Sequence, residues 1–210
     1  MIPILDLQEG SHVEKCEQLV STLSSVGFVY LRNHGVPLED VRTCQELFRG
    51  FFNQSLEIKE SFRENEDNPF MGYKACETER LDPTQKEKDL REAMVFYAHN
   101  INANKWPSIA IETAVKSLVD NMAVLSARLL EMIGIGLGLD DPKLILKAHS
   151  AFGPEDKCDS KSFTTYGAIY YPKLEGELKE GQVLCGEHAD YGSITLLMQD
   201  HVGGLEVGTN

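Results

Sequence analysis

Apolar residues recur at helical spacing in three long stretches of the chain. Within each stretch they fall three or four positions apart, the period that places them on one face of an α-helix. The stretches cover residues 11–24, 38 to about 52, and about 108 to 139. Short runs rich in β-branched and aromatic residues separate them and predict strands. These runs are residues 2–5, 28–31 and 92–99.

The pattern changes after residue 150, where short strand-like runs follow one another. These runs are residues 166–171, 181–185, 194–199 and 204–207. A chain that is rich in helices first and in strands last predicts one domain, in which a β-sandwich or barrel is covered by helices. Before this change, residues 64–89 are polar, so we expect an irregular connection there, with a strand fragment around residues 71–73.

Three glycines, Gly134, Gly136 and Gly138, stand at the end of the last predicted helix. Their spacing is GxGxG and it closes a helix, whereas a dinucleotide-binding loop has the spacing GxGxxG and opens one. We therefore expect these glycines to weaken and end the helix, and we expect no phosphate site there.

Composition and charge narrow the function classes. Hydrophobic residues make up 42% and charged residues 25% of the chain, as in ordinary globular proteins. The formal net charge of −13 repels nucleic acid and anionic lipid surfaces. Acidic and basic residues alternate between residues 86 and 92, which is typical of a solvated surface. We therefore expect neither a nucleic-acid nor a membrane partner.

The start of the chain and its cysteines indicate a cytoplasmic protein. No basic leader precedes an apolar core, and no later run approaches the roughly 18 apolar residues of a membrane span. The five cysteines are widely spaced and form no CxxC pair, which predicts reduced thiols rather than disulfides or a zinc ribbon.

Candidate chemistry is concentrated at His188 and Asp190, at the head of a strand-like run. Residues i and i+2 of a strand point to the same face, so this imidazole and this carboxylate can converge on one cation. With a second histidine from elsewhere, the pair would form the facial triad that binds ferrous iron. Taken alone, however, an HxD pair is more often two polar residues on the wet face of a strand.

The residues around this pair resemble a known pattern. Residues 188–207, HADYGSITLLMQDHVGGLEV, are similar to HxDxxxLTxLxQDxxxGLxV of the iron(II)- and 2-oxoglutarate-dependent oxygenases of the isopenicillin N synthase-like family. Only Ile194 departs from this pattern. Further resemblances follow in the family's order: IPILDL at residues 2–7, GFVYLRNHGVP at 27–37, FFNQSLEIK at 51–59, and Trp106-Pro107. Together they favour the metal interpretation over the solvated strand.

The resemblance implies an α+β or mainly β fold, a double-stranded β-helix (jelly roll) buttressed by N-terminal helices. Residues 1–110 would be the N-terminal non-haem dioxygenase region, residues 111–150 a buttressing helix region, and residues 151–210 the first part of the jelly roll. The resemblance also implies Fe(II) held by His188 and Asp190, with 2-oxoglutarate as cosubstrate, O2 as oxidant and ascorbate as a candidate reductant.

In the family, a distal histidine completes the iron site and an RxS motif beyond it binds the cosubstrate. Neither has a counterpart here, since the sequence ends at Asn210, so we expect the jelly roll to be incomplete at its C-terminal end. His201 lies in the turn-like stretch DHVGG, where its side chain is expected to point away from the site. The third iron ligand therefore stays open.

Tyr171 is the candidate cosubstrate residue. AIYYP, residues 168–172, stands where the family commonly has RxNYYP, and the resemblance implies that the tyrosine before the proline helps to bind 2-oxoglutarate. Gly167 and Ile169 replace the two polar residues of that motif, which predicts a modified cosubstrate shell. The alternative is that Tyr171 is an aromatic residue of the barrel core.

Other polar side chains have simpler interpretations. Cys185 stands three residues before His188, and a Cys–His nucleophile pair is an alternative chemistry. Positions i and i+3 of a strand face opposite sides, however, so a buried thiol is the simpler interpretation. The remaining histidines lack a partner motif and are interpreted as structural; they are His12, His34, His99 and His149.

The sequence therefore predicts a non-haem iron oxygenase that uses 2-oxoglutarate and O2 to hydroxylate or desaturate a small organic substrate. The alternative is a truncated or non-catalytic member of the family, which acts as a binding module with weak or no metal binding.

Overall fold

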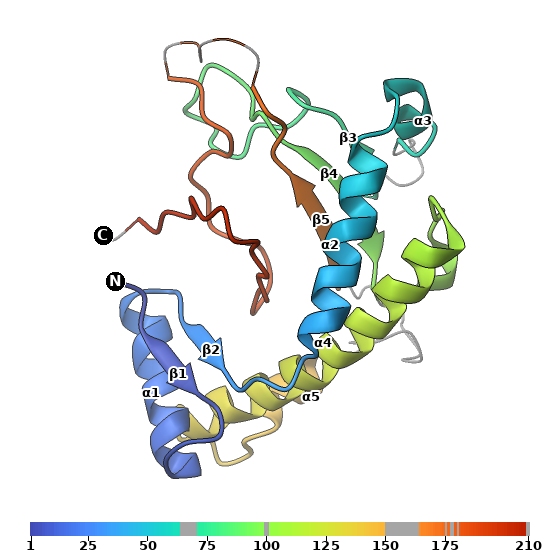
Figure 1. The fold of residues 1–210 in the computed structure, drawn as a ribbon. Helices are drawn as coiled ribbons and strands as arrows, with labels where there is room; N and C mark the ends of the chain where they lie inside the picture. The colour runs from blue at the N-terminus through green and yellow to red at the C-terminus, as the bar shows by residue number, and fades with distance from the viewer. Residues whose placement is uncertain are drawn as a thin grey trace.

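Two small sheets and a layer of helices make up the fold (Figure 1). The computed structural model describes residues 1–63, 71–98, 101–149, 164–174, 176, 179 and 181–208. In chain order the elements are β1 (Ile4–Asp6), α1 (His12–Ser25), β2 (Tyr30–Arg32), α2 (Leu38–Phe52), α3 (Leu56–Glu60), β3 (Gly72–Lys74), β4 (Glu92–Tyr97), the 3-10 helix η1 (Ile101–Ala103), α4 (Ile109–Gly136), α5 (Leu144–Ala148) and β5 (Thr165–Tyr170).

The first sheet is the parallel pair β1–β2, and α1 makes the connection between its strands. Leu5 lies opposite Leu31 in this pair and is almost fully buried. A capping box fixes the start of α1: the Ser11 hydroxyl accepts the Glu14 amide, and the Glu14 carboxylate accepts the Ser11 amide. This box explains why the helix begins where the apolar period begins.

The second sheet is antiparallel, in the order β3–β4–β5. Its central strand, β4, pairs with β5 so that Glu92 lies opposite Tyr170 and Tyr97 opposite Thr165. The long helix α4, which packs against α1 and α2, connects this strand to β5 through the chain. Figure 1 shows α2 lying along this sheet.

A layer of aromatic side chains fills the space between α2 and the second sheet. Phe52 of α2 stacks on Tyr170 of β5 with ring centroids 5.1 Å apart. Phe96 of β4 stacks on Trp106 at 4.3 Å, and Phe48 of α2 lies 6.0 Å from the ring of Phe96. Such aromatic burial is a large apolar contribution to stability, so this layer fixes the position of β4 and β5 relative to α2.

A buried ion pair attaches α3 to the second sheet. Lys59 Nζ lies 2.6 Å from Glu92 Oε2, which also accepts the Tyr73 hydroxyl at 2.6 Å. Lys59 Nζ donates as well to the carbonyl of Phe52 at the end of α2. The prediction that residues 86–92 form a solvated surface is therefore wrong at Glu92, and also at Asp89, since both side chains are buried. Hydrogen bonds compensate their charge.

The long periodic segments were predicted well and the shortest elements were not. The three helices and the strands of residues 2–5, 28–31, 71–73, 92–99 and 166–171 are present, with ends that differ from the prediction by at most three residues. The two five-residue helices, α3 and α5, were missed because they are too short to show a helical period.

The predicted strands at residues 181–185, 194–199 and 204–207 are wrong for the structure as described, since these residues make no strand ladder there. The alternation that predicted the second one is nevertheless present. Ile194, Leu196 and Met198 pack against the core, while Thr195 and Leu197 are exposed. Alternation reports which face is buried, whereas a ladder also needs a neighbouring strand, and the described residues do not provide one.

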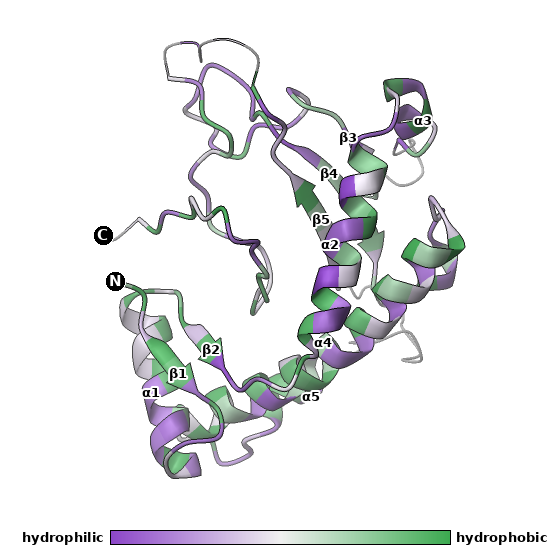
Figure 2. Ribbon diagram, in the orientation of Figure 1, coloured by the Kyte–Doolittle hydropathy of each residue, from purple (hydrophilic) through white to green (hydrophobic). Residues whose placement is uncertain are grey.

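Hydrophobic and hydrophilic residues alternate along α2, α4 and the other helices (Figure 2). None of the helices in the described part of the chain is long and apolar enough to cross a membrane.

The glycines at the end of α4 do more than end the helix. Gly138 adopts φ 67° just past the last turn, as a helix-ending glycine does. Gly136 is the contact point with α1, because a Cβ there would lie 2.3 Å from the carbonyl oxygen of Cys16. A Cβ on Gly134 would lie 2.0 Å from the carbonyl oxygen of Pro142. These glycines therefore allow close packing on both sides of the helix end.

We expect Gly136→Ala to lower the free energy of unfolding by about 2–3 kcal/mol, in the upper range for overpacked sites, because the new methyl group would force α1 and α4 apart. The control is Gly50→Ala in α2, where a Cβ would meet nothing within 4 Å. That change should raise the free energy of unfolding by up to about 1 kcal/mol through helix propensity. Urea denaturation measures both, and equal stabilities of the two variants would contradict the packing role.

Candidate metal centre

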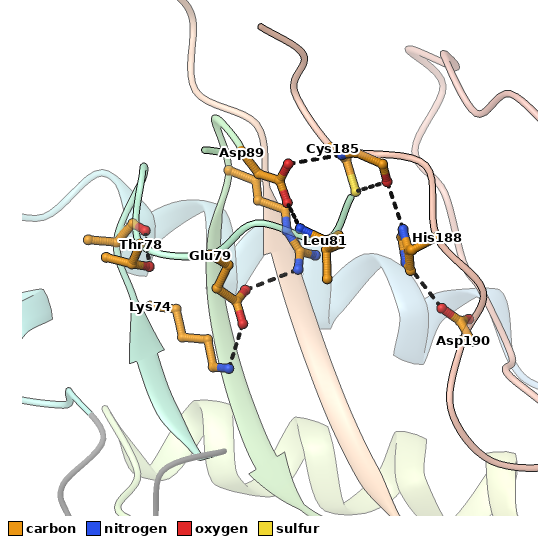
Figure 3. A network of polar contacts seen from close by, with 11 residues as sticks. Lys74, Thr78, Glu79, Leu81, Asp89, Cys185, His188 and Asp190 are labelled. Atoms are coloured by element: carbon orange, nitrogen blue, oxygen red, sulfur yellow. Dashed lines mark hydrogen bonds and ion pairs between the residues drawn. The ribbon is translucent and has the colours of Figure 1, made fainter. Parts of the chain in front are cut away.

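The candidate ligands lie in an irregular segment, residues 186–193, that joins no strand ladder among the described residues. His188 Nε2 lies 3.2 Å from Asp190 Oδ1, and their side chains are 32% and 50% exposed. The predicted convergence of these two side chains is therefore present, although no strand pairing produces it. Figure 3 shows the imidazole and the carboxylate pointing toward each other.

A backbone carbonyl orients the imidazole. His188 Nδ1 lies 2.8 Å from the carbonyl oxygen of Gly186. Because a carbonyl oxygen can only accept, Nδ1 must carry the proton in this contact. In the neutral ring Nε2 then has a free lone pair, directed at Asp190. Metal-binding histidines commonly have this arrangement, in which the second ring nitrogen donates to a carbonyl or carboxylate.

The geometry of the two atoms fits a shared cation. When Nδ1 carries the only ring proton, Nε2 and the Asp190 carboxylate are both acceptors and could share a metal cation; a second proton, on Nε2, would make the same contact an ion pair. Two ligand atoms at the usual distances of about 2.0–2.2 Å from one metal ion, and at a right angle, lie about 3 Å apart. The observed 3.2 Å is compatible with that arrangement. The donor set, one imidazole and one carboxylate, suits ferrous iron.

A third protein ligand is not found in the described part of the chain. No group of three or more His, Cys, Asp and Glu side chains that could hold a metal ion occurs among these residues. His201 is exposed in a turn, as predicted. His34 is a turn residue whose Nδ1 accepts the Val36 amide, and His99 lies outside the described residues.

Tyr171, the candidate cosubstrate residue, follows β5 directly and is 46% exposed. Partial burial raises the pKa of its phenol to about 12, and the neighbouring Cys185 thiol, which is hydrogen-bonded to it, adds to this rise. The same thiol lies 3.9 Å from the Gly186 carbonyl oxygen. Cys185 therefore contacts the carbonyl that orients His188 rather than the imidazole itself, which disfavours a Cys–His nucleophile pair.

Sequence reasoning missed the residues that hold the segment in place. At one end, the Gly186 amide donates to Asp89 Oδ1 at 3.0 Å. At the other end, the Ser193 hydroxyl lies 2.9 Å from His149 Nε2, while His149 Nδ1 contacts the Ile145 carbonyl at 2.7 Å. Neither residue gave a signal in the sequence, since the charged run that contains Asp89 indicates a solvated surface and His149 lacks a partner motif.

A charged cluster lies beside Asp89. The Glu79 carboxylate binds both Lys74 Nζ, at 2.7 Å, and an Arg91 amino group, at 3.0 Å. The Nε of Arg91 is buried and has no hydrogen-bond partner among the described residues. These contacts stiffen the loop between β3 and β4, which borders the candidate metal centre (Figure 3).

Comparison with known proteins identifies the family. The family described as "non-haem dioxygenase in morphine synthesis N-terminal" matches residues 2–109. The chain belongs to the isopenicillin N synthase-like iron(II)/2-oxoglutarate-dependent oxygenases. The resemblance seen in the sequence is thereby confirmed.

Several oxygenase relatives match nearly the whole chain. Validamycin A dioxygenase of Streptomyces hygroscopicus subsp. limoneus is 30% identical over 98% of this chain and 60% of its own length. The 2-oxoglutarate-dependent dioxygenase frbA of Dothideomycetidae sp. (strain 11243) is 31% identical over 98% of this chain and 65% of its own length. The chain thus spans less than two thirds of the length of these oxygenases.

Solved structures share the fold. A full-length protein of Neurospora crassa, crystallised in complex with alpha-KG, superposes with a TM-score of 0.74 at 22% identity, over 91% of this chain and 62% of that one. JOX2, crystallised with 2OG, Fe and JA, gives a TM-score of 0.63 at 22% identity, over 82% of this chain and 48% of that one. The mixed helix-and-sheet arrangement is therefore a fold that the chain shares with the corresponding parts of these two proteins.

We expect the phenol of Tyr171 to titrate with a pKa of about 12, and Cys185→Ala to lower this value while leaving it above that of a free tyrosine. Loss of the thiol removes the secondary cause of the shift, whereas burial, the largest cause, remains. Carbon-13 NMR of tyrosine labelled at Cζ measures the change. Cys76→Ala is the control and should leave the Tyr171 titration unmoved; an equal shift in both variants would contradict the assignment.

Proposed function

We propose that the protein to which this chain belongs is a non-haem iron oxygenase that uses 2-oxoglutarate and O2 to oxidise a small organic substrate. The observation that carries the proposal is the pair His188 Nε2 and Asp190 Oδ1, 3.2 Å apart, with the other ring nitrogen held by a carbonyl. Family membership supports it, and so do the relatives named as 2-oxoglutarate-dependent dioxygenases.

His188 and Asp190 would hold iron(II), which with 2-oxoglutarate supplies the activation of O2. The chain itself orients the ligands. The Gly186 carbonyl keeps the proton of His188 on Nδ1, so Nε2 stays available, and Asp190 offers its carboxylate beside it. Tyr171, whose phenol is protonated at neutral pH like that of any tyrosine, would donate a hydrogen bond to the cosubstrate.

Residues 181–207 would be strands of a jelly roll in the whole protein. Their alternating burial supports this proposal, since Ile194, Leu196 and Met198 already face the core. A third iron ligand would come from outside the described residues. The substrate would be a small molecule, hydroxylated or desaturated.

A second candidate is a family member that binds but does not catalyse. The observation that favours it is that no group of three or more metal-binding side chains occurs in the described part of the chain. Two protein ligands hold iron less well than three. On this alternative, purified full-length protein would bind iron weakly and convert no 2-oxoglutarate to succinate, whereas an oxygenase produces succinate when iron(II), O2 and a substrate are supplied.

Loss of either proposed ligand should weaken iron binding. We expect His188→Ala and Asp190→Ala each to lower the affinity for Fe(II) by at least about 100-fold, since even the loss of a residue that supports a ligand costs about 10–100-fold. Anaerobic calorimetric titration of the apo protein with Fe(II) measures the affinity. His201→Ala is the control and should bind iron as the wild type does. A loss in His201→Ala equal to that in His188→Ala would assign His201 to the site instead.

Tyr171→Phe should weaken 2-oxoglutarate binding to the iron-loaded protein by about 3–10-fold, the value of one neutral hydrogen bond, and leave Fe(II) affinity unchanged. Tyr170→Phe is a matched control, because the Tyr170 ring stacks on Phe52 in the aromatic layer. Titration with 2-oxoglutarate under anaerobic conditions measures both variants. Equal affinities of Tyr171→Phe and wild type would leave Tyr171 as an ordinary packing aromatic.

A further inference from the structure

Asp89 is a buried carboxylate that joins two separate parts of the chain. The residue is 1% exposed, and each of its carboxylate oxygens accepts a different backbone amide. Oδ2 accepts Leu81 N at 3.0 Å, and Oδ1 accepts Gly186 N at 3.0 Å. Burying a charge without such partners would cost several kcal/mol. The two amides therefore compensate the charge, and the charge in turn holds the two amides.

The backbone of Asp89 is itself fixed. Its amide donates to the Glu79 carbonyl and its carbonyl accepts the Glu77 amide, both at 3.0 Å. Three residues further on, Glu92 begins β4. Asp89 is thus attached on one side to the loop and on the other to the central strand of the second sheet, so its carboxylate is a rigid anchor.

Gly186 connects Asp89 to His188 through its two backbone groups. The amide of Gly186 is held by Asp89, and its carbonyl accepts His188 Nδ1 at 2.8 Å. The residue also fits too tightly for a side chain, because a Cβ would lie 2.8 Å from Asp82 N and 3.3 Å from Asp89 Oδ1. Figure 3 shows the resulting line of contacts from Asp89 through this backbone unit to His188 and Asp190.

We propose that Asp89 is a positioning residue for the candidate metal centre. By fixing Gly186, it holds the carbonyl that keeps the His188 proton on Nδ1 and directs Nε2 toward Asp190. The proposal deepens the proposed function, because it takes Nε2 to be an iron ligand; the positioning of the ring does not depend on that role.

The segment needs such an anchor because residues 186–193 make no strand ladder in the described structure. Without ladder bonds, side-chain contacts must restrict it. The contact between His149 and Ser193 restrains the far end, but it lies beyond both candidate ligands. Asp89 acts on the near end, at the same residue whose carbonyl orients the imidazole.

The test compares Asp89→Asn with Asp82→Asn in the full chain, first without metal. Asparagine has one acceptor oxygen and would turn an amino group toward the second amide, so one of the two bonds is lost. Asp82 lies in the same loop and bonds only Thr84 and Gln85 among the residues described, which makes it a matched control. We expect Asp89→Asn to speed hydrogen exchange of the Gly186 amide at least about 10-fold, the loss of one hydrogen bond, and to abolish the Nδ1–H preference of His188 in nitrogen-15 NMR. Asp82→Asn should change neither.

Anaerobic titration with Fe(II) is the second readout. Asp89→Asn should lose about 10–100-fold in affinity, as partners of metal ligands typically do, and Asp82→Asn should lose none. If the wild type binds no Fe(II), the proposed function fails, while exchange and tautomer still decide the positioning role. Unchanged Gly186 exchange and an unchanged His188 tautomer in Asp89→Asn would overturn that role, even if its melting temperature fell.

If Asp89→Asn does not fold, Gly186→Ala takes its place, with Gly167→Ala as control. A Cβ at Gly167 would meet nothing within 4 Å. Gly186→Ala should displace the peptide from Asp89 and give the same loss of the Nδ1–H tautomer, and Gly167→Ala should not. Equal His188 spectra in these two variants would overturn the proposal.

Discussion

The antiparallel pairing of β4 and β5 determines where the candidate chemistry lies. Because Glu92 at the start of β4 lies opposite Tyr170 at the end of β5, the residues just before one strand and just after the other meet at the same end of the sheet. Asp89 and Tyr171 are those residues. The aromatic layer beneath, with Phe52 stacked on Tyr170, holds this register against α2. The candidate metal centre thus depends on packing that none of its own side chains provides.

The site is held by bonds from side chains to backbone and to one another rather than by a strand ladder. Residues 186–193 are attached at Gly186 through Asp89 and at Ser193 through His149. Each bond is modest, about 0.5–1.5 kcal/mol net for a neutral pair and more for a carboxylate acceptor. The loss of the buried acceptor is the costlier change, since it also leaves an amide unpaired. The bond between Asp89 and Gly186, which lies next to His188, therefore does more to position the segment than the contact between His149 and Ser193.

The sequence predicted those features of the fold and of the site that depend on neighbouring residues, and missed those that depend on residues far away in the chain. The helices of residues 11–24 and 38–52 show a full helical period of apolar residues, so they were found nearly to the residue. His188 and Asp190 were found because their spacing and neighbours form a pattern. Asp89 belongs to a charged run whose alternation indicates solvent, and its burial results from an amide 97 residues away in the chain. No local pattern carries that information. The strand predictions at residues 181–185, 194–199 and 204–207 were wrong for the same reason, because a strand ladder depends on a partner strand far away in the sequence.

The family match and the candidate metal site lie in different parts of the chain. The family match covers residues 2–109, whereas the pair that would hold iron stands at residues 188 and 190. The contact between Asp89 and Gly186 joins these two parts. An HxD pair in an irregular segment without such a contact would leave its imidazole free to rotate, and a rotating ring offers the wrong nitrogen for part of the time. With the Gly186 carbonyl fixed from the N-terminal region, one tautomer and one orientation are favoured. The N-terminal region is therefore part of the candidate centre's geometry as well as a support for the sheet.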